Sequence, residues 1–183
     1  VPAGLPDNAR AYVQSCIDFN GAVRASLREI EASGAVTVAL AARWSVPSNL
    51  QQGLGDWEAR LGALVGTIRA AGLGVLLIAD VPQLSSDIPN CVMRRGAAAC
   101  ARSRADVDRD AAAALAVLRR IATHTPGVNV LDPVDFLCSR DTCPVVRDGI
   151  VLYRDKSHLA EAASKLLAPA LGAALAGHLA AHR

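Results

Sequence analysis

The chain has 183 residues, of which 52% are hydrophobic and 20% charged, a composition that excludes an intrinsically disordered protein. At about 150 residues per domain, we expect residues 1–183 to form a single domain with a sizeable core. The formal net charge of +2 argues against a nucleic-acid partner bound through phosphate neutralisation.

Helical and strand patterns alternate along the chain. We expect helices over residues 19–33, 57–71, 106–125 and 159–181, strands over 35–41, 74–79 and 128–131, and irregular stretches over 81–105 and 132–148. The first two strands are continuous apolar runs, which are typical of strands buried on both faces. Strands that alternate with helices of this length predict an α/β fold with a parallel sheet, whose ligands bind at the carboxyl ends of the strands.

The five cysteines fall into two close pairs and one remainder. Cys91 and Cys100 are nine positions apart, Cys138 and Cys143 are five apart, and Cys16 is left over. Neither pair has the spacing of a zinc site, so no metal is expected. Two short disulfide-closed loops are the simpler interpretation and imply an oxidising compartment. Ordinary buried thiols in a cytosolic protein are the alternative. The most apolar stretch, residues 166–177, is too short to span a bilayer.

The most suggestive local motif is Asp155-Lys156-Ser157-His158. A carboxylate three residues before a histidine can accept the imidazole Nδ1–H, which leaves Nε2 to deprotonate a serine. The spacing also has a purely structural interpretation, in which Asp155 or Ser157 caps the last helix and His158 is a surface residue of its first turn. Spacing alone leaves both interpretations open.

The motif stands in the segment LYRDKSHLA, residues 152–160, which precedes an Ala- and Leu-rich helix. This segment resembles the final block of the SGNH hydrolase superfamily, and most of all the SGNH domains fused to integral-membrane O-acyltransferases of bacterial surface polysaccharides. Further matches follow in order over nearly the whole chain, at residues 40–45, 81–83, 88–91, 132–133 and 137–143. The resemblance implies a three-layer α/β/α, flavodoxin-like fold and a Ser–Asp–His triad in which Asp155 and His158 are two members.

The third member of that triad does not carry over. Relatives have a Gly-Asp-Ser block after their first strand, whereas the only Gly-Asp here is Gly55-Asp56, followed by Trp57. The resemblance therefore implies that the first two strands and the nucleophile lie upstream of Val1, so that the domain is N-terminally incomplete. It further implies that strand 35–41 has an exposed edge and that Cys16 pairs outside this chain. Of the local serines, Ser45, Ser48, Ser85 and Ser86 follow strands, but none stands in a nucleophile elbow.

A second departure concerns the oxyanion hole. Relatives usually place an Asn after their third strand, where this chain has Arg43 and Trp44. Backbone N–H groups or the Arg43 guanidinium would then serve the oxyanion or the substrate. The alternative is a packed strand end in which Arg43 makes a cation–π contact with Trp44.

The resemblance implies serine-dependent acyl transfer outside the cytoplasm, in the periplasm or on the outer face of the plasma membrane. The protein would be an O-acetyltransferase, or an esterase (a hydrolase), acting on a polysaccharide. Its partners would be an acyl donor, a glycan acceptor and an upstream membrane acyltransferase domain, with no cofactor. One alternative is a secreted glycan-binding or scaffolding domain that has lost its nucleophile. Another is a cytosolic α/β protein in which Asp155 and His158 share their spacing by chance.

Overall fold

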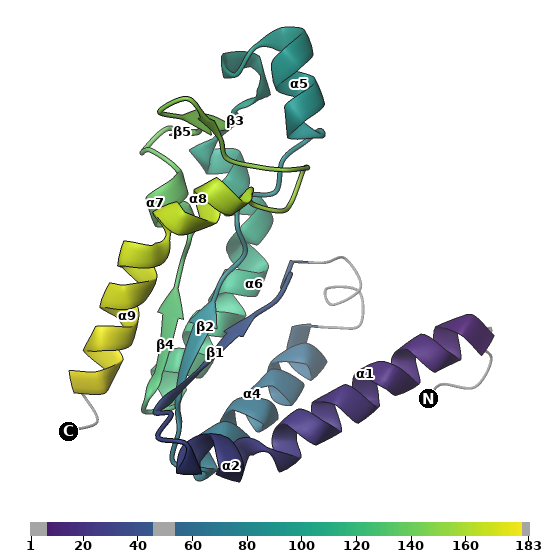
Figure 1. The fold of residues 1–183 in the computed structure, drawn as a ribbon, viewed down its shortest axis with the longest axis vertical. Coiled ribbons are helices and arrows are strands. Elements are labelled where there is room, and N and C mark those ends of the chain that lie inside the picture. Colours follow the sequence, from purple (N-terminus) through teal and green to yellow (C-terminus); the bar gives the residue numbers. More distant parts are fainter. Residues whose placement is uncertain (1–6, 46–53, 181–183) are drawn as a thin grey trace.

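The computed structural model describes residues 7–45 and 54–180 (Figure 1). The helices are α1 (Asp7–Ala25), α2 (Leu27–Ala32), α4 (Leu54–Ala70), α5 (Ile88–Arg95), the 3₁₀-helix η1 (Ala98–Cys100), α6 (Arg104–His124), α7 (Val134–Leu137), α8 (Glu161–Leu166) and α9 (Ala168–Ala180). The strands are β1 (Thr37–Ala41), β2 (Gly74–Ile78), β3 (Arg102–Ser103), β4 (Val128–Leu131), β5 (Thr142–Cys143), β6 (Val146–Arg147) and β7 (Ile150–Val151).

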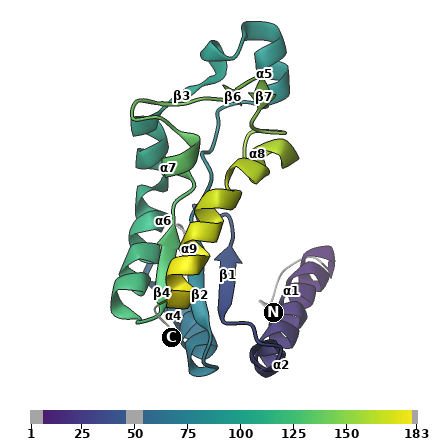
Figure 2. The same cartoon turned by 60° about the vertical axis from the view of Figure 1, so that its left-hand side comes forward.

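The centre of the fold is a parallel sheet with the strand order β1-β2-β4. Helices α4 and α6 cover one face and α9 covers the other, which gives three layers (Figures 1 and 2). The middle strand, β2, is continuously apolar because both of its faces are buried. Val75 and Leu77 belong to the core under α4 and α6, whereas Leu76 belongs to the core under α9. The predicted α/β fold with a parallel sheet is confirmed.

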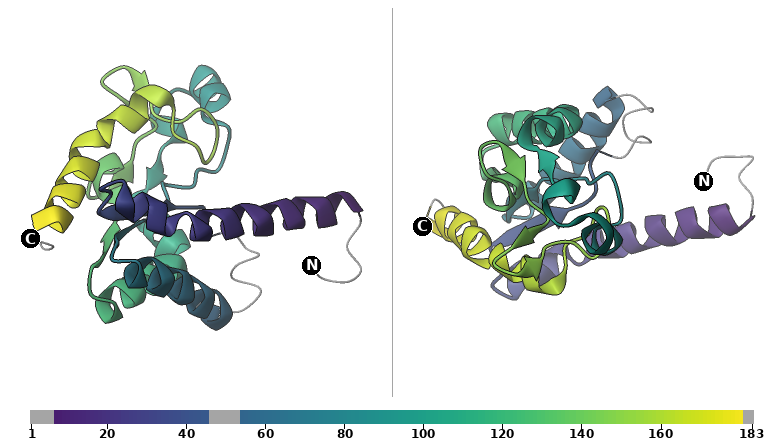
Figure 3. Two further views of the ribbon diagram at one scale, coloured as in Figure 1. Left: turned by 60° about the horizontal axis from the view of Figure 1, so that its bottom comes forward. Right: turned by 90° about the horizontal axis from the view of Figure 1, so that it is seen from above.

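Strand β1 differs from its prediction, because it is only half-buried. Ala39 and Ala41 are exposed, and β2 is its sole strand partner within the described residues. An apolar groove of about 490 Å³ lies between β1, α1, α2 and α4, with Val38 and Leu40 in its wall. Helix α1 extends away from the body of the molecule (Figures 1 and 3). Burial on both faces would need a further element beside β1.

The two stretches predicted to be irregular contain short elements, so that prediction was wrong. They build a lobe beyond the carboxyl ends of the sheet strands, with α5, α7 and small antiparallel pairs of strands (Figure 2). Helix α5 begins where the Asp87 side chain accepts the N–H of Asn90. Elements this short carry too few periodic positions to be recognised from their sequence.

Both predicted disulfides are present in the lobe. Cys91 bonds to Cys100 and joins α5 to η1, and Cys138 bonds to Cys143 at the end of α7. The prediction of two disulfide-closed loops is confirmed. The remaining cysteine, Cys16, lies in α1.

Two predicted helices are divided. The helix expected over 19–33 starts earlier and breaks at Ser26, between α1 and α2. The helix expected over 159–181 is α8 followed by α9, because Pro169 has no N–H to continue the ladder from α8. Helix α8 begins at Glu161, so His158 lies before the helix and not in its first turn. Within the described ranges, no helix combines the length and apolar character that a bilayer crossing requires.

Candidate active site

Asp155 and His158 form a hydrogen-bonded pair in the loop between β7 and α8. Asp155 Oδ2 lies 2.7 Å from His158 Nδ1. The other carboxylate oxygen, Oδ1, accepts the backbone N–H groups of Ser157 at 2.7 Å and of His158 at 2.8 Å. Since Nδ1 is engaged by Asp155, Nε2 is the ring nitrogen available to exchange a proton with a substrate or nucleophile.

The electrostatics of the pair favour an ionised carboxylate. The backbone N–H of Ser157, with help from the ring and backbone N–H of His158, holds the pKa of Asp155 well below its usual range. Asp155 is therefore anionic at neutral pH and can stabilise a protonated imidazole. The His158 side chain is 63% exposed, so the ring is accessible to reacting groups.

The loop that carries this pair is anchored to the rest of the fold. Arg154 N–H donates to the carbonyl of His158 at 3.0 Å, which closes the loop on itself. Leu84 N–H donates to the Lys156 carbonyl at 2.8 Å, which ties the loop to the segment after β2. The Tyr153 side chain is buried in the core of the lobe. These contacts bring His158 to the carboxyl edge of the sheet, although it follows the last strand by several residues.

His158 lines an open cavity of about 290 Å³ at that edge. Its walls come from the ends of β1 and β2, from the residues that follow them and from the histidine loop. The lining residues are Ala41, Ala42, Arg43, Ile78, Ala79, Asp80, Val81, Gln83, Ser157 and His158. Three of the predicted site residues therefore lie together, because Asp155 is hydrogen-bonded to His158, and Arg43 and His158 line the same cavity.

Trp44 lies beneath this region and not in the cavity wall. Its side chain is buried, and its indole Nε1–H donates to the Ile78 carbonyl at 2.7 Å. Its ring also contacts Trp57, with ring centroids 6.0 Å apart. Arg43, the residue before it, is exposed.

The structure also locates the serines that follow strands. Ser45 lines a small cavity that adjoins the His158 cavity and shares Asp80 with it, and Ser86 lines a depression beside α5. Ser48 lies outside the described residues. Ser157 Oγ is 3.5 Å from His158 Nδ1, the nitrogen that Asp155 already engages, so its hydroxyl is badly placed to be deprotonated by Nε2.

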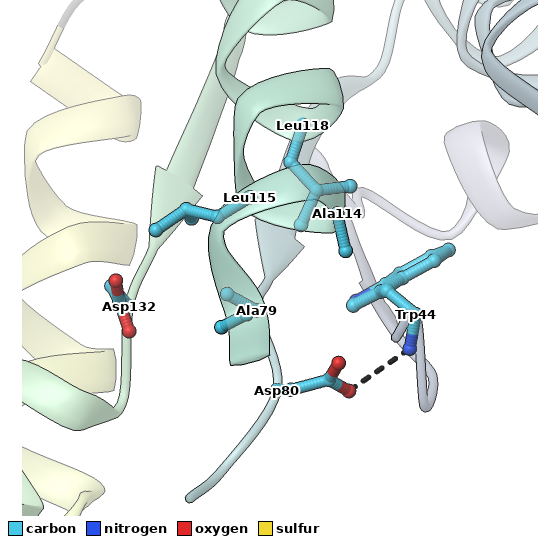
Figure 4. Close-up of a pocket in the computed structure, with 8 residues that line it drawn as sticks. Trp44, Ala79, Asp80, Ala114, Leu115, Leu118 and Asp132 are labelled. Carbon is cyan, nitrogen blue, oxygen red and sulfur yellow. Dashed lines mark hydrogen bonds between the residues drawn. The ribbon is translucent and has the colours of Figure 1, made fainter. Parts of the chain in front are cut away.

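Sequence reasoning missed one residue of this region, Asp80. Its side chain is buried, and it is the second residue after the end of β2. One carboxylate oxygen accepts the backbone N–H of Trp44 at 2.9 Å (Figure 4). The other accepts the backbone N–H of Ser45 at 2.8 Å. The available signal was a carboxylate immediately after an apolar strand, at the edge where α/β proteins bind ligands. Over residues 7–45 and 54–180, no three His, Cys, Asp or Glu side chains gather as a metal would require.

Comparison with known proteins identifies a family that this chain matches and a solved structure to which it is similar. Residues 1–173 match the family described as SGNH domain (fused to AT3 domains). Among solved structures, the chain is similar to the periplasmic domain of a lipopolysaccharide acetyltransferase from Salmonella ser. Paratyphi A, with a TM-score of 0.57 and 18% identity. The match covers 81% of this chain and 60% of that domain.

At 18% identity this likeness shows a shared fold. The chain spans 60% of the length of the domain it matches. A comparison with curated proteins gave no match. The match over residues 1–173 agrees with the resemblance found in the sequence, and the chain belongs to the family of SGNH domains fused to AT3 domains.

Proposed function

We propose that this domain takes part in serine-dependent acyl transfer to a bacterial cell-surface glycan, with His158 as the general base. The observation that carries the proposal is the Asp155–His158 pair, whose Oδ2 and Nδ1 atoms are 2.7 Å apart beside a cavity at the carboxyl edge of the sheet. This arrangement orients the ring and leaves Nε2 for proton transfer. The match to SGNH domains supports the same chemistry.

The proposed reaction has two half-reactions. A serine Oγ attacks the carbonyl carbon of the acyl donor, and its proton passes to His158 Nε2. That proton then goes to the departing oxygen of the donor, which leaves an acyl-serine. An acceptor hydroxyl then gives its proton to Nε2 and attacks the acyl carbon. As the bond from the acyl carbon to the serine Oγ breaks, Nε2 returns the proton to Oγ, so that the new ester forms and the free serine is restored. A glycan as acceptor gives an O-acetyltransferase, and water gives an esterase.

The nucleophilic serine, we propose, belongs to a segment outside these 183 residues, so that the SGNH domain extends beyond them. The Gly-Asp-Ser block is missing from the sequence. The exposed edge of β1 and the apolar groove beside it leave space for further strands of the same sheet. A strand seated there would end on the same side of the sheet as β1, whose final residue Ala41 lines the His158 cavity.

For the oxyanion we propose the Arg43 guanidinium as a hydrogen-bond donor. Arg43 lines the cavity that holds His158, and its charge would stabilise a developing oxyanion. For Trp44 we propose the packing role, which its burial and its bond to the Ile78 carbonyl support. No cofactor enters the proposed reaction.

An extracytoplasmic location completes the proposal. Two disulfides within one chain are typical of proteins that fold in an oxidising compartment. The similar Salmonella structure is a periplasmic domain, and the family is described as fused to AT3 domains. We therefore propose a membrane acyltransferase domain as the partner in the same polypeptide, which would supply the acyl group.

The alternative function is a non-catalytic domain that binds glycan for a membrane partner. The absence of Gly-Asp-Ser from the sequence favours it. The two functions differ in one respect that can be measured, because only an enzyme needs an activated serine.

Fluorophosphonate labelling of the full-length protein, followed by peptide mapping, tests the proposal. We expect one labelled serine, with labelling lost in His158→Ala. The matched control is His124→Ala, because His124 is an exposed histidine at the end of α6, whose Nδ1 lies 2.8 Å from the Arg120 carbonyl oxygen. Labelling that survives His158→Ala would overturn His158 as the general base, and a folded protein that takes no label would overturn the enzyme in favour of the binding domain. Release of acetate from an acetyl ester, with and without glycan, separates transferase from esterase.

A further inference from the structure

Asp80 connects the ends of two neighbouring strands. Ala79, the residue before it, donates its N–H to the Leu131 carbonyl at 2.9 Å, so the backbone here continues the pairing of β2 with β4. From this position the Asp80 carboxylate reaches the turn after β1 and accepts the N–H of Trp44 (Figure 4). It also accepts the N–H of Ser45. Asp80 is 8% exposed, and its bond to Trp44 is buried whereas its bond to Ser45 is partly buried.

The residues held in this way adjoin the candidate active site. Arg43 precedes the two clamped residues, and Arg43, Asp80 and His158 line one cavity. The indole of Trp44 adds a second attachment through its bond to the Ile78 carbonyl. The direction of the chain at Arg43 is therefore set by the bonds that Trp44 and Ser45 make to residues at the end of β2.

The two hydrogen bonds from Trp44 and Ser45 to Asp80, which we call the Asp80 clamp, also remove one candidate for the oxyanion hole, namely those two backbone N–H groups. Backbone N–H groups at the end of a strand are common oxyanion donors. Here the N–H groups of Trp44 and Ser45 are donated to a buried carboxylate. An oxyanion would compete with that carboxylate for them and would be repelled by its charge. The Arg43 guanidinium is a donor that this turn can offer to the cavity without breaking the bonds to Asp80.

We propose that Asp80 is a positioning residue that holds the turn after β1 so that Arg43 faces the reacting centre at His158. Asp80 acts through Arg43 and does not itself touch the acyl group. This inference rests on the proposed function, because it assigns to Arg43 a task in acyl transfer. A purely structural Asp80 would contribute to stability independently of Arg43.

A double-mutant cycle in the full-length protein separates these roles, with Asp80→Asn, Arg43→Ala and the double variant. The amide of Asp80→Asn keeps one acceptor oxygen for the two N–H groups. Loss of one oxyanion donor costs about 10²–10³-fold in kcat, so we expect Arg43→Ala to fall in that range and Asp80→Asn to lose about 10- to 100-fold. In the Arg43→Ala background, Asp80→Asn should cost less than about 2-fold, because the residue it positions is gone.

The matched control is Asp132→Asn. Asp132 directly follows β4, and Asp80 follows β2 after one residue, but the Asp132 carboxylate accepts the nearby N–H of Val134 at 3.1 Å, within its own loop. We expect kcat to stay within about 2-fold of wild type in this variant. Additive effects of Asp80→Asn and Arg43→Ala, or equal losses in Asp80→Asn and Asp132→Asn, would overturn the positioning role.

A second measurement does not depend on activity. Hydrogen–deuterium exchange of peptides that contain Trp44 and Ser45 should accelerate in Asp80→Asn and stay unchanged in Asp132→Asn. If Asp80→Asn does not fold, Asp80→Ser replaces it, because its smaller side chain leaves space for a water to bind the two N–H groups. Unchanged exchange would overturn the clamp. Equal transfer by wild type and His158→Ala would overturn the proposed function instead, and the exchange result would then decide the clamp alone.

Discussion

The Asp155 carboxylate binds His158 at two points, the ring through Nδ1 at 2.7 Å and the backbone through its N–H at 2.8 Å. A three-residue separation allows both contacts within one turn of chain, so the pair needs no distant residue to form. The loop must also lie at the edge of the sheet. The hydrogen bond from Leu84 N–H to the Lys156 carbonyl helps to hold it there.

The first prediction concerns the charge of Asp155. Asp155→Asn should leave the fold in place, because an amide oxygen can still accept the N–H groups of Ser157 and His158. It should lower acyl transfer by about 10⁴-fold, since the amide neither fixes the ring tautomer nor stabilises the imidazolium. Steady-state transfer by the full-length protein measures this loss, with His124→Ala as the control. A loss under about 10-fold would mean that the pair does not act as general base and orienting group.

The second prediction concerns acid stability. Because the folded state lowers the pKa of Asp155, the carboxylate stabilises the fold above its unfolded pKa of about 3.9. That contribution is lost as the pH falls through the lower, folded pKa. Asp155→Asn should therefore be less stable than wild type at pH 7, and the difference should shrink below about pH 4. Urea unfolding at several pH values measures it, and a difference that is constant with pH would contradict the assignment.

Sequence patterns predicted the elements and contacts that a single continuous stretch of the chain specifies. Strand β2 is a short apolar run between helices, and the Asp155–His158 pair lies within four residues, so a local stretch of sequence is enough to recognise each of them. Asp80 was missed because its partners, Trp44 and Ser45, lie 36 and 35 positions away. The half-burial of β1 was missed because burial depends on the neighbours of a strand and not on its own composition.

The third prediction separates the two interpretations of Trp44. Trp44→Phe keeps an aromatic ring against Trp57 but loses the Nε1–H bond to the Ile78 carbonyl. It should cost about 1 kcal/mol in the free energy of unfolding and leave acyl transfer near wild type. Trp44→Ala should cost about 3–5 kcal/mol, because it removes a buried side chain. Lower transfer by Trp44→Phe at unchanged stability would instead indicate that Trp44 serves the site, either by contact with the substrate or by holding the turn that carries Arg43.

The fourth prediction concerns the disulfides of the lobe. Replacing Cys91 and Cys100 together with serine should lower stability by about 2–3 kcal/mol, and so should replacing Cys138 and Cys143. Each bond closes a short loop and limits the unfolded chain. Urea unfolding with and without reductant checks the result, because the reductant should weaken wild type more than either double variant. An unfolding midpoint of wild type that reductant does not move would contradict the prediction.

The fifth prediction compares two glycines with nearly equal backbone angles, Gly127 before β4 with a φ of 78° and Gly149 in the β6–β7 hairpin with a φ of 77°. Alanine at either position pays for a left-handed conformation, at about 1–2 kcal/mol. At Gly127 a Cβ would also overlap the Arg69 guanidinium, which Nη1 fixes to the Leu73 carbonyl at 2.7 Å, whereas nothing lies within 4 Å at Gly149. Gly127→Ala should therefore unfold at a lower urea concentration than Gly149→Ala. Equal midpoints would mean that Arg69 moves aside freely and that its bond to the Leu73 carbonyl adds little to the joint between α4 and β2.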